Sequence, residues 1–269
     1  MPTPAPEPIT IRYGRDPAQF GQLHLPPADG PVGVVVVLHG GYWRERFGLE
    51  LGTPLAADLA SYGVAAWNVE YRRVGNGGGW PATLRDVAAA VDALAGVVAG
   101  VAVRAGTRLD LTDVRAVGHS AGGQLAVWSA ARGLLPAGEP GADPVVPITR
   151  VVAQAGVLDL VAADGQRLGD GAVRAFLGAT AAQRPARYAR SSPVALLPSG
   201  VAVTCVHGDA DVSVPISQSE TYVAAARAAG DPASMVRLPG VEHFALIDPA
   251  TPAWAACRAA VLAPRAAAS

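Results

Sequence analysis

The sequence predicts a doubly wound α/β fold built on a mostly parallel sheet. Residues 33–38 form a β-branched run without alternation, which is typical of a strand buried on both faces of a parallel sheet. Strand-like and helix-like stretches then alternate along the chain, and this pattern favours helices on both sides of one sheet. Residues 114–132 add a short apolar strand, a glycine-flanked serine and an Ala-rich helix, which is typical of a tight strand–turn–helix unit.

The elements follow in order from their composition. Two short strands joined by a polar turn come first, at residues 9–13 and 20–25, and they predict an antiparallel pair at one edge of the sheet. Apolar and β-branched runs predict the other strands, at residues 33–38, 64–69, 114–117, 150–155, 201–206 and 234–238. Ala- and Leu-rich segments predict the helices, at residues 49–62, 81–98, 124–132, 217–229 and 252–262.

Residues 160–198 interrupt this alternation. Glycines and prolines separate short apolar patches there, which predicts a small cap of short helices and turns inserted between two strands. We therefore expect a single α/β domain over residues 1–269, with a disordered, proline-rich tail at residues 1–8.

Composition excludes several classes of function. The 269 residues are 51% hydrophobic and 16% charged, as in a globular protein with a large core. A formal net charge of −1 gives no electrostatic case for binding nucleic acid or an anionic membrane. The 21 basic residues are all arginine, so lysine-base and Schiff-base mechanisms are excluded.

The start of the chain has no signal-peptide pattern, and the longest apolar run, Val32–Leu38, is too short to span a bilayer. The two cysteines form no disulfide framework; Cys205 lies in an apolar run and is interpreted as a core thiol. No zinc-type spacing of His and Cys occurs in the sequence. We expect a cytoplasmic protein without a metal or cofactor.

Ser120 is the candidate nucleophile. Gly118 and Gly122 flank it in a G-x-S-x-G pattern, where the turn leaves no room for a β-carbon two places either side. The turn would expose the hydroxyl and aim the first amides of the following helix at any negative charge beside it. The pattern alone is also compatible with an ordinary turn and a capping serine.

A serine hydroxyl needs a base to remove its proton and an acid to orient that base. In nucleophile-elbow enzymes the acid and then the histidine follow the serine, each at the end of a strand. The strand at 201–206 leads to Asp209 and Asp211, and the strand at 234–238 leads to His243. His207–Pro215 resembles the His-Gly-x-x-Asp-x-x-Val-Pro segment of those enzymes, which implies that Asp211 is the acid. Asp209 is then expected to shape the turn by bonding its own backbone. His119 and His207 are interpreted as structural histidines, and His24 lies too early in the chain.

The segment His39-Gly40-Gly41-Tyr42 follows the third strand. Its glycines allow the main chain to approach a substrate closely. We predict an oxyanion hole from Gly40, Gly41 and Tyr42 together with Ala121 from the elbow, although a plain Gly-Gly turn would have the same sequence.

These motifs together resemble the α/β-hydrolases, in particular the hormone-sensitive-lipase-like and kynurenine formamidase-like group. His39–Trp43 is similar to the HGGxW motif of kynurenine formamidases, and Gly118–Gly123 also fits. Glu70-Tyr71-Arg72 and Trp80-Pro81 resemble the DYRL…FP segment of that superfamily, whose acid and arginine brace loops. The resemblance covers residues 34–244 and is thin through the cap. The catalytic domain of prolyl-oligopeptidase-like enzymes is also similar, but this chain is too short for their propeller.

Four aromatic residues, Trp43, Tyr71, Trp80 and Phe244, adjoin these motifs. They are predicted to line a substrate pocket that would suit an N-formyl aniline, with ordinary packing under loops as the alternative. Arg73 is a candidate contact for a substrate carboxylate.

The sequence thus predicts acyl transfer to water through an acyl-enzyme on a small ester or amide. The first substrate hypothesis is an arylformamide of the N-formylkynurenine type. A general short-acyl carboxylesterase, a biosynthetic hydrolase or thioesterase, and a non-catalytic binding module stay open. A homodimer is compatible with the sequence.

Overall fold

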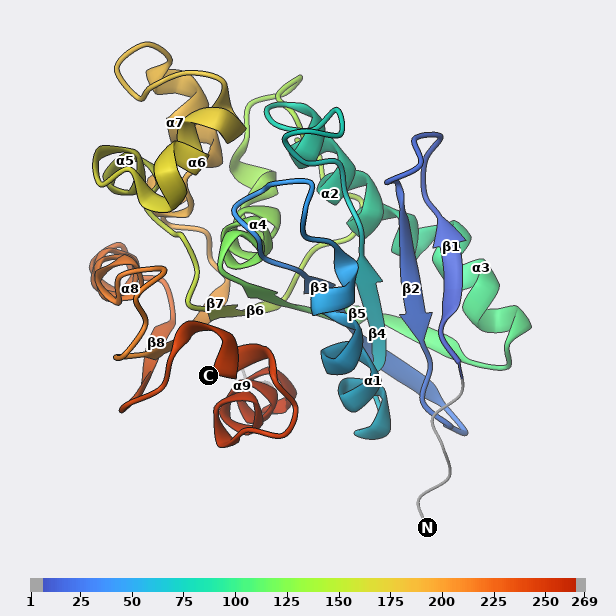
Figure 1. The fold of residues 1–269 in the computed structure, drawn as a ribbon. Helices are drawn as coiled ribbons and strands as arrows, with labels where there is room; N and C mark the ends of the chain where they lie inside the picture. Colours follow the sequence, from blue (N-terminus) through green and yellow to red (C-terminus); the bar gives the residue numbers. More distant parts are fainter. Residues whose placement is uncertain (1–6, 265–269) are drawn as a thin grey trace.

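Eight strands form one mixed sheet in the computed structural model, which describes residues 7–264 (Figure 1). Its order is β1-β2-β4-β3-β5-β6-β7-β8. The strands are β1 (Ile9–Arg12), β2 (Phe20–His24), β3 (Pro31–Leu38), β4 (Ala65–Val69), β5 (Arg108–His119), β6 (Arg150–Gln154), β7 (Ala202–Gly208) and β8 (Ala233–Leu238). β2 pairs antiparallel with β1 and β4, and every other pairing is parallel, which confirms the predicted sheet and its N-terminal edge.

Helices cover both faces of the sheet (Figure 1). α1 (Thr53–Ser61) and α9 (Pro252–Leu262) pack on one face. α2 (Ala82–Asp92), α3 (Val97–Arg104), α4 (Ala121–Ala130) and α8 (Ser217–Ala228) pack on the other. Alternate residues of β3 enter opposite cores, Val34 and Val36 on one side and Val35 and Val37 on the other. This explains why the strand is continuously apolar.

The strand order reverses direction at β3. The chain passes from β3 outward to β4 and then returns to β5 on the other side of β3. The carboxyl ends of β3 and β5 therefore border a topological switch point, where open α/β sheets bind ligands. Leu38 pairs with Gly118 there, so the segments after both strands begin side by side.

Several predicted elements differ in their bounds from the observed ones. The single helix expected at residues 81–98 is divided into α2 and α3, bent by 43°. Gly96 causes this break, because its φ of −126° and ψ of −106° lie outside the helical region. β5 begins at Arg108, earlier than expected, and its register against β3 shifts between Gly33 and Val34.

Short helices lie between β6 and β7, in the segment that the sequence analysis describes as a cap. They are α5 (Leu160–Gly165), α6 (Leu168–Leu177), α7 (Pro185–Ser191) and the 3₁₀ helix η4 (Pro193–Leu196). Of the expected N-terminal tail, residues 1–6 lie outside the described residues.

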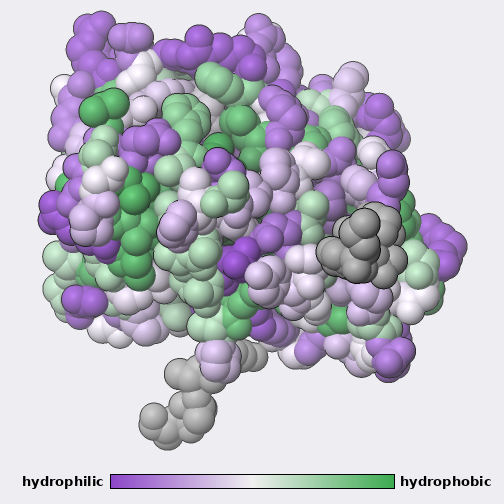
Figure 2. All heavy atoms as spheres, turned by 60° about the horizontal axis from the view of Figure 1, so that its bottom comes forward, coloured by the Kyte–Doolittle hydropathy of each residue, from purple (hydrophilic) through white to green (hydrophobic). Residues whose placement is uncertain are grey.

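The described surface is mixed in polarity. On the face drawn in Figure 2, hydrophobic residues lie in small groups between hydrophilic ones. Among residues 7–264 no single helix has the length and apolar composition to cross a bilayer. The segments of α2 and α3 have the required length and apolar composition only when they are taken together, as a bent pair.

Asp58 of α1 links this helix to α9 on the same face of the sheet. Its Oδ2 accepts hydrogen bonds from Trp254 Nε1 at 2.6 Å and Arg258 Nη1 at 2.8 Å. Asp58→Ala should lower the free energy of unfolding in urea by about 1–3 kcal/mol, because the buried indole N–H loses its acceptor. Asp29→Ala, on an exposed turn, is the matched control. Equal effects of the two substitutions would contradict this account.

Candidate active site

Ser120 stands between β5 and α4 in a strained conformation. Its φ of 55° and ψ of −118° place a non-glycine residue at positive φ. The Ser120 N–H donates to Gln154 O at 2.8 Å, which fixes the turn to the neighbouring strand β6. This is the strand–turn–helix elbow that the sequence predicts.

The glycines around Ser120 are required by close backbone contacts. A β-carbon on Gly118 would lie 2.1 Å from Gly122 O, and one on Gly122 would lie 2.0 Å from Leu38 O. Because both contacts involve main-chain atoms, no side chain could move aside to relieve them. The G-x-S-x-G pattern is therefore a packing requirement of the end of β3 on the start of α4.

Asp211 and His243 are joined by a short hydrogen bond. His243 Nδ1 lies 2.6 Å from Asp211 Oδ2. The other oxygen, Oδ1, accepts from the N–H groups of Ser213 at 2.8 Å and Val214 at 2.9 Å. Asp211 follows β7, and His243 begins the 3₁₀ helix η5 (His243–Ile247) after β8, so two neighbouring strand ends supply the pair.

Asp209, the second candidate acid, shapes a turn instead. Its Oδ1 accepts from Gly240 N at 2.7 Å, and its Oδ2 pairs with Arg237 Nε at 3.3 Å on the surface. Of the two acids, only Asp211 contacts His243 among the described residues.

The carboxylate of Asp211 is held in its ionised form. Burial opposes ionisation, but hydrogen bonds from His207, His243 and the Val214 N–H outweigh it and hold the pKa of Asp211 well below 3.8, its ordinary value. His243 Nδ1 must then carry the proton of the 2.6 Å bond, which leaves Nε2 as the basic nitrogen.

Two further histidines support this pair. His207 Nε2 lies 3.0 Å from Val214 O and 3.3 Å from Asp211 Oδ2, while its Nδ1 lies 2.8 Å from Ser219 Oγ. His119 Nε2 donates to His243 O at 3.0 Å, and the two rings pack at 4.3 Å. Burial lowers the pKa of His119 to about 3, so this imidazole is neutral. Both side chains are buried, in keeping with the structural interpretation of their sequence positions.

The structure brings Ser120 and His243 to one cavity of about 210 Å³. The lining residues are Gly41, Tyr42, Arg46, Phe47, Leu51, His119, Ser120, Ser213, His243 and Phe244. Sequence reasoning missed Arg46, Phe47, Leu51 and Ser213. The first three follow the HGG segment closely, and Ser213 follows Asp211 by two residues.

The HGG segment lies against the serine. A β-carbon on Gly40 would lie 2.8 Å from the main-chain oxygen of His119 and 3.1 Å from Ser120 Cβ, so glycine is required for the main chain to come this near. Gly41 has a φ of 109° and Tyr42 a φ of 52°. Neither N–H donates a hydrogen bond to a described residue. Ala121 is the first residue of α4 and so has no intrahelical acceptor for its N–H.

This segment is held from both sides. Tyr42 Oη donates to Ser213 O at 2.5 Å, which links the segment to the loop of Asp211. Behind it, His39 Nδ1 lies 2.8 Å from Gly40 O and Nε2 lies 3.2 Å from Glu70 Oε1. The segment is therefore fixed before any substrate arrives.

Arg73 does not reach the cavity, which corrects the expectation that it meets a substrate carboxylate. It is buried and pairs with Glu70. Arg72 binds both oxygens of Asp86 at 2.7 Å. Glu70 and Arg72 thus brace loops, as the resemblance implies.

Three of the four aromatic residues predicted to line the pocket lie elsewhere. Trp43 is buried, donates to Gln124 Oε1 at 3.1 Å and stacks on Phe176. Tyr71 is buried, and its hydroxyl donates to His39 O at 2.7 Å. Trp80 lines a different cavity. Phe244, 52% exposed, lines the cavity of Ser120. The packing alternative therefore describes Trp43 and Tyr71.

No group of three His, Cys, Asp or Glu side chains that could hold a metal ion occurs within the described part of the chain. The free thiols of Cys205 and Cys257 are both buried.

A family model described as BD-FAE matches residues 22–225. A search of the curated proteins finds no match.

Several solved structures are similar over nearly the whole chain. A truncated carbohydrate esterase from gut microbiota is 19% identical with a TM-score of 0.78, and the match covers 96% of each chain. The propionate-bound esterase Est2 of the planctomycete Thermogutta terrifontis is 21% identical with a TM-score of 0.74, over 96% of this chain and 93% of its own. An acetyl ester-xyloside bifunctional hydrolase from Caldicellulosiruptor lactoaceticus is 21% identical with a TM-score of 0.69, over 89% and 88%. These likenesses show the α/β-hydrolase fold that the sequence predicts.

The depressed pKa of Asp211 predicts a pH-dependent contribution to stability. A carboxyl group whose pKa is lowered by folding stabilises the protein above its unfolded value, and this contribution is lost as pH falls through the folded pKa. Asp211→Asn should therefore lower the free energy of unfolding most above pH 3.8, and the gap from the unsubstituted protein should shrink on further acidification. Urea unfolding at a series of pH values measures the gap, with Asp29→Asn as the exposed control. A gap that stays constant through the acid range would refute the assignment.

Proposed function

The chain belongs to the BD-FAE family, and from that premise we propose that it is a serine esterase acting on esters of small acyl groups. One observation carries the proposal. An ionised aspartate holds the imidazole of His243 by a 2.6 Å hydrogen bond at the cavity that also contains Ser120. A serine beside an oriented imidazole is the arrangement that acyl transfer requires.

The proposed reaction has two steps. In the first, Ser120 Oγ attacks the ester carbonyl while His243 Nε2 takes the hydroxyl proton. The carbonyl oxygen becomes an oxyanion that faces the N–H groups of Gly41, Tyr42 and Ala121, with Gly40 allowing the close approach. When this tetrahedral intermediate collapses, the C–O bond to the alcohol breaks and the alcohol takes the proton from His243.

In the second step a water molecule replaces the alcohol. His243 Nε2 takes a proton from the water, and the resulting hydroxide adds to the acyl carbon. The bond to Ser120 Oγ then breaks, Ser120 recovers its proton from His243, and the carboxylic acid leaves. Asp211 stays ionised throughout and stabilises the imidazolium in both steps.

The size of the cavity supports a short acyl group. Its volume of about 210 Å³ lies below the roughly 300–1,000 Å³ of sites that enclose drug-sized ligands. Phe47 and Leu51 provide apolar contacts for such a group. The exposed ring of Phe244 lies 5.3 Å from the His243 ring, where it can contact the leaving alcohol.

An ester is favoured over an arylformamide. The formamide hypothesis rested on an aromatic-walled pocket and on the HGGxW resemblance. Trp43, the tryptophan of that motif, packs on Phe176 and Gln124 instead of on a substrate. The family match and the esterases of similar fold also favour an ester. The kynurenine formamidase-like grouping therefore stays a prediction.

Ser120→Ala should lower kcat for p-nitrophenyl acetate by roughly 10⁴-fold or more, because the attacking oxygen is removed. Labelling by a fluorophosphonate probe should disappear in the same variant. Ser217→Ala, which changes an exposed serine on α8, should retain both the hydrolysis of p-nitrophenyl acetate and the labelling by the probe. Turnover that persists in a folded Ser120→Ala protein would remove Ser120 from its proposed role. If neither the unsubstituted protein nor the control reacts, a binding module becomes the better description.

The acyl and leaving-group preference has its own test. Specificity constants should be compared on p-nitrophenyl acetate, p-nitrophenyl decanoate, N-formylkynurenine and an acetyl thioester of N-acetylcysteamine. The cavity volume predicts that acetate exceeds decanoate by at least about tenfold, since a long chain would not fit. Higher values for N-formylkynurenine or the thioester would replace the ester assignment by a formamidase or a thioesterase.

A further inference from the structure

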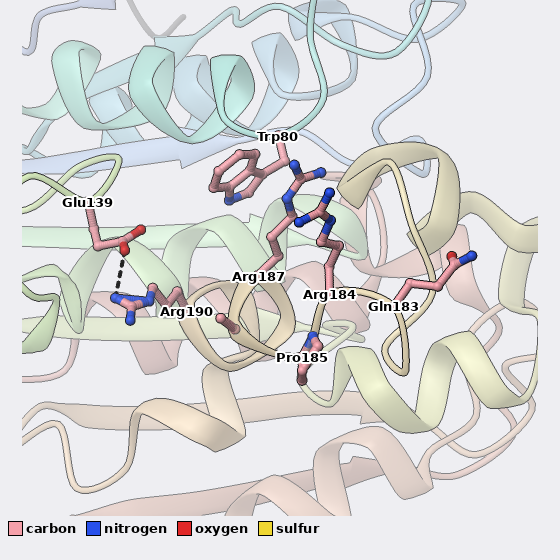
Figure 3. Close-up of a pocket in the computed structure, with 8 residues that line it drawn as sticks. Trp80, Glu139, Gln183, Arg184, Pro185, Arg187 and Arg190 are labelled. Carbon is pink, nitrogen blue, oxygen red and sulfur yellow. Dashed lines mark ion pairs between the residues drawn. The ribbon is translucent and has the colours of Figure 1, made fainter.

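A second cavity, of about 390 Å³, lies between α7 and the loops that carry Trp80 and Glu139 (Figure 3). We call it the arginine cavity. Its lining residues are Trp80, Glu139, Gln183, Arg184, Pro185, Ala186, Arg187 and Arg190. It shares no residue with the cavity of Ser120. The proposed esterase mechanism therefore makes no use of it.

The arginine cavity carries an excess of positive charge. Arg190 Nη1 pairs with Glu139 Oε1 at 2.7 Å, which neutralises one of its three arginines. Arg187 lies with its Cζ 4.2 Å from the ring centroid of Trp80, and its Nη1 donates to Leu177 O at 2.9 Å. Neither Arg184 nor Arg187 pairs with a carboxylate of the described residues. Two guanidinium charges are thus left uncompensated in a protein whose formal net charge is −1.

The lining is also rich in hydrogen-bond donors and poor in acceptors. The Trp80 Nε1–H is buried without an acceptor among the described residues. Gln183 uses its Oε1 to accept from the Thr180 N–H at 3.0 Å, so its amide NH₂ remains as a donor. Glu139, the one acidic side chain of the lining, is already paired. Such a lining is complementary to a ligand that only accepts hydrogen bonds.

These donors are mounted on fixed elements. Trp128 Nε1 donates to Arg190 O at 2.9 Å, and Gln124 Nε2 donates to Ser191 O at 2.8 Å, so α4 holds the end of α7. Across the cavity, the backbone N–H of Trp80 donates to Phe176 O at 2.7 Å. In Figure 3 the side chains of Arg187, on α7, and Arg184, which directly precedes α7, extend toward Trp80. A backbone that is fixed in advance loses less conformational entropy when a ligand binds.

We propose that the arginine cavity binds the carboxylate of a small organic acid. A carboxylate is planar and only accepts hydrogen bonds, and a guanidinium can bind both of its oxygens at once. The cavity volume lies within the range of about 300–1,000 Å³ that holds small organic molecules, and it exceeds what an inorganic anion fills. The acid is either a separate ligand or the leaving-group part of an extended ester.

The test uses benzoate and benzamide, which have the same shape and differ in charge. Benzoate should bind the full-length protein at least about tenfold more tightly than benzamide by isothermal titration calorimetry, because only the carboxylate pairs with guanidinium groups. Arg184→Gln should weaken benzoate binding at least about fivefold. The exposed Arg184 side chain makes no hydrogen bond or ion pair with a described residue, so this variant removes no internal polar interaction. Arg85→Gln, on the exposed side of α2, is the matched control.

Other outcomes would overturn the proposal. Equal binding of benzoate and benzamide, no binding of benzoate, or benzoate binding unchanged in Arg184→Gln each exclude a carboxylate site here. Inorganic phosphate binding more tightly than benzoate would exclude the organic acid. Hydrolysis of p-nitrophenyl acetate should be unchanged in Arg184→Gln, so failure of this site is distinguishable from failure of the esterase assignment. Weaker hydrolysis by Arg184→Gln of a carboxylated ester alone would identify the acid as part of the substrate.

Discussion

The hydrogen bond between Asp211 and His243 is the interaction on which the candidate site depends. The carboxylate must be ionised for the bond to orient the imidazole, yet the side chain is almost fully buried, which by itself would favour the neutral acid. Two backbone N–H groups and the imidazole of His207 compensate for that burial. The conformation of the loop after β7 therefore serves to stabilise the charged carboxylate of Asp211.

Sheet topology brings the other parts to this bond. Ser120 follows β5, the HGG segment follows β3, and the Asp211–His243 pair follows β7 and β8. Parallel strands end at one edge, and the reversal of order at β3 opens a crevice there. The hydrogen bond from Tyr42 to Ser213 O joins two of these segments directly. Residues far apart in the chain thus form one cavity without a separate domain to assemble it.

Features determined by a few neighbouring residues could be predicted from the sequence. The contacts of individual side chains that depend on distant parts of the chain could not. Glycines at 118 and 122 indicate the elbow, because a β-carbon at either position would meet main-chain atoms. The five residues 118–122 are therefore enough to predict this turn. Asp211 could be distinguished from Asp209 by its position in the segment His207–Pro215. The expectation about backbone bonding did not separate them, because Asp211 itself accepts from the N–H groups of Ser213 and Val214 in its own turn. By contrast, burial decides the roles of Trp43, Tyr71 and Arg73, and it depends on the cap and on Glu70. The helix α4 also begins three residues earlier than expected, since glycines at 122 and 123 are weak helix formers that the tertiary packing overrides.

The most direct test of the account is the position of the acyl group during turnover. The protein should be mixed with p-nitrophenyl acetate, quenched in acid while hydrolysis proceeds, digested and examined by mass spectrometry. The account predicts an acetyl group on the peptide that contains Ser120, at the Ser120 hydroxyl. Steady hydrolysis with the acetyl group on another residue, or with none on the protein, would contradict it.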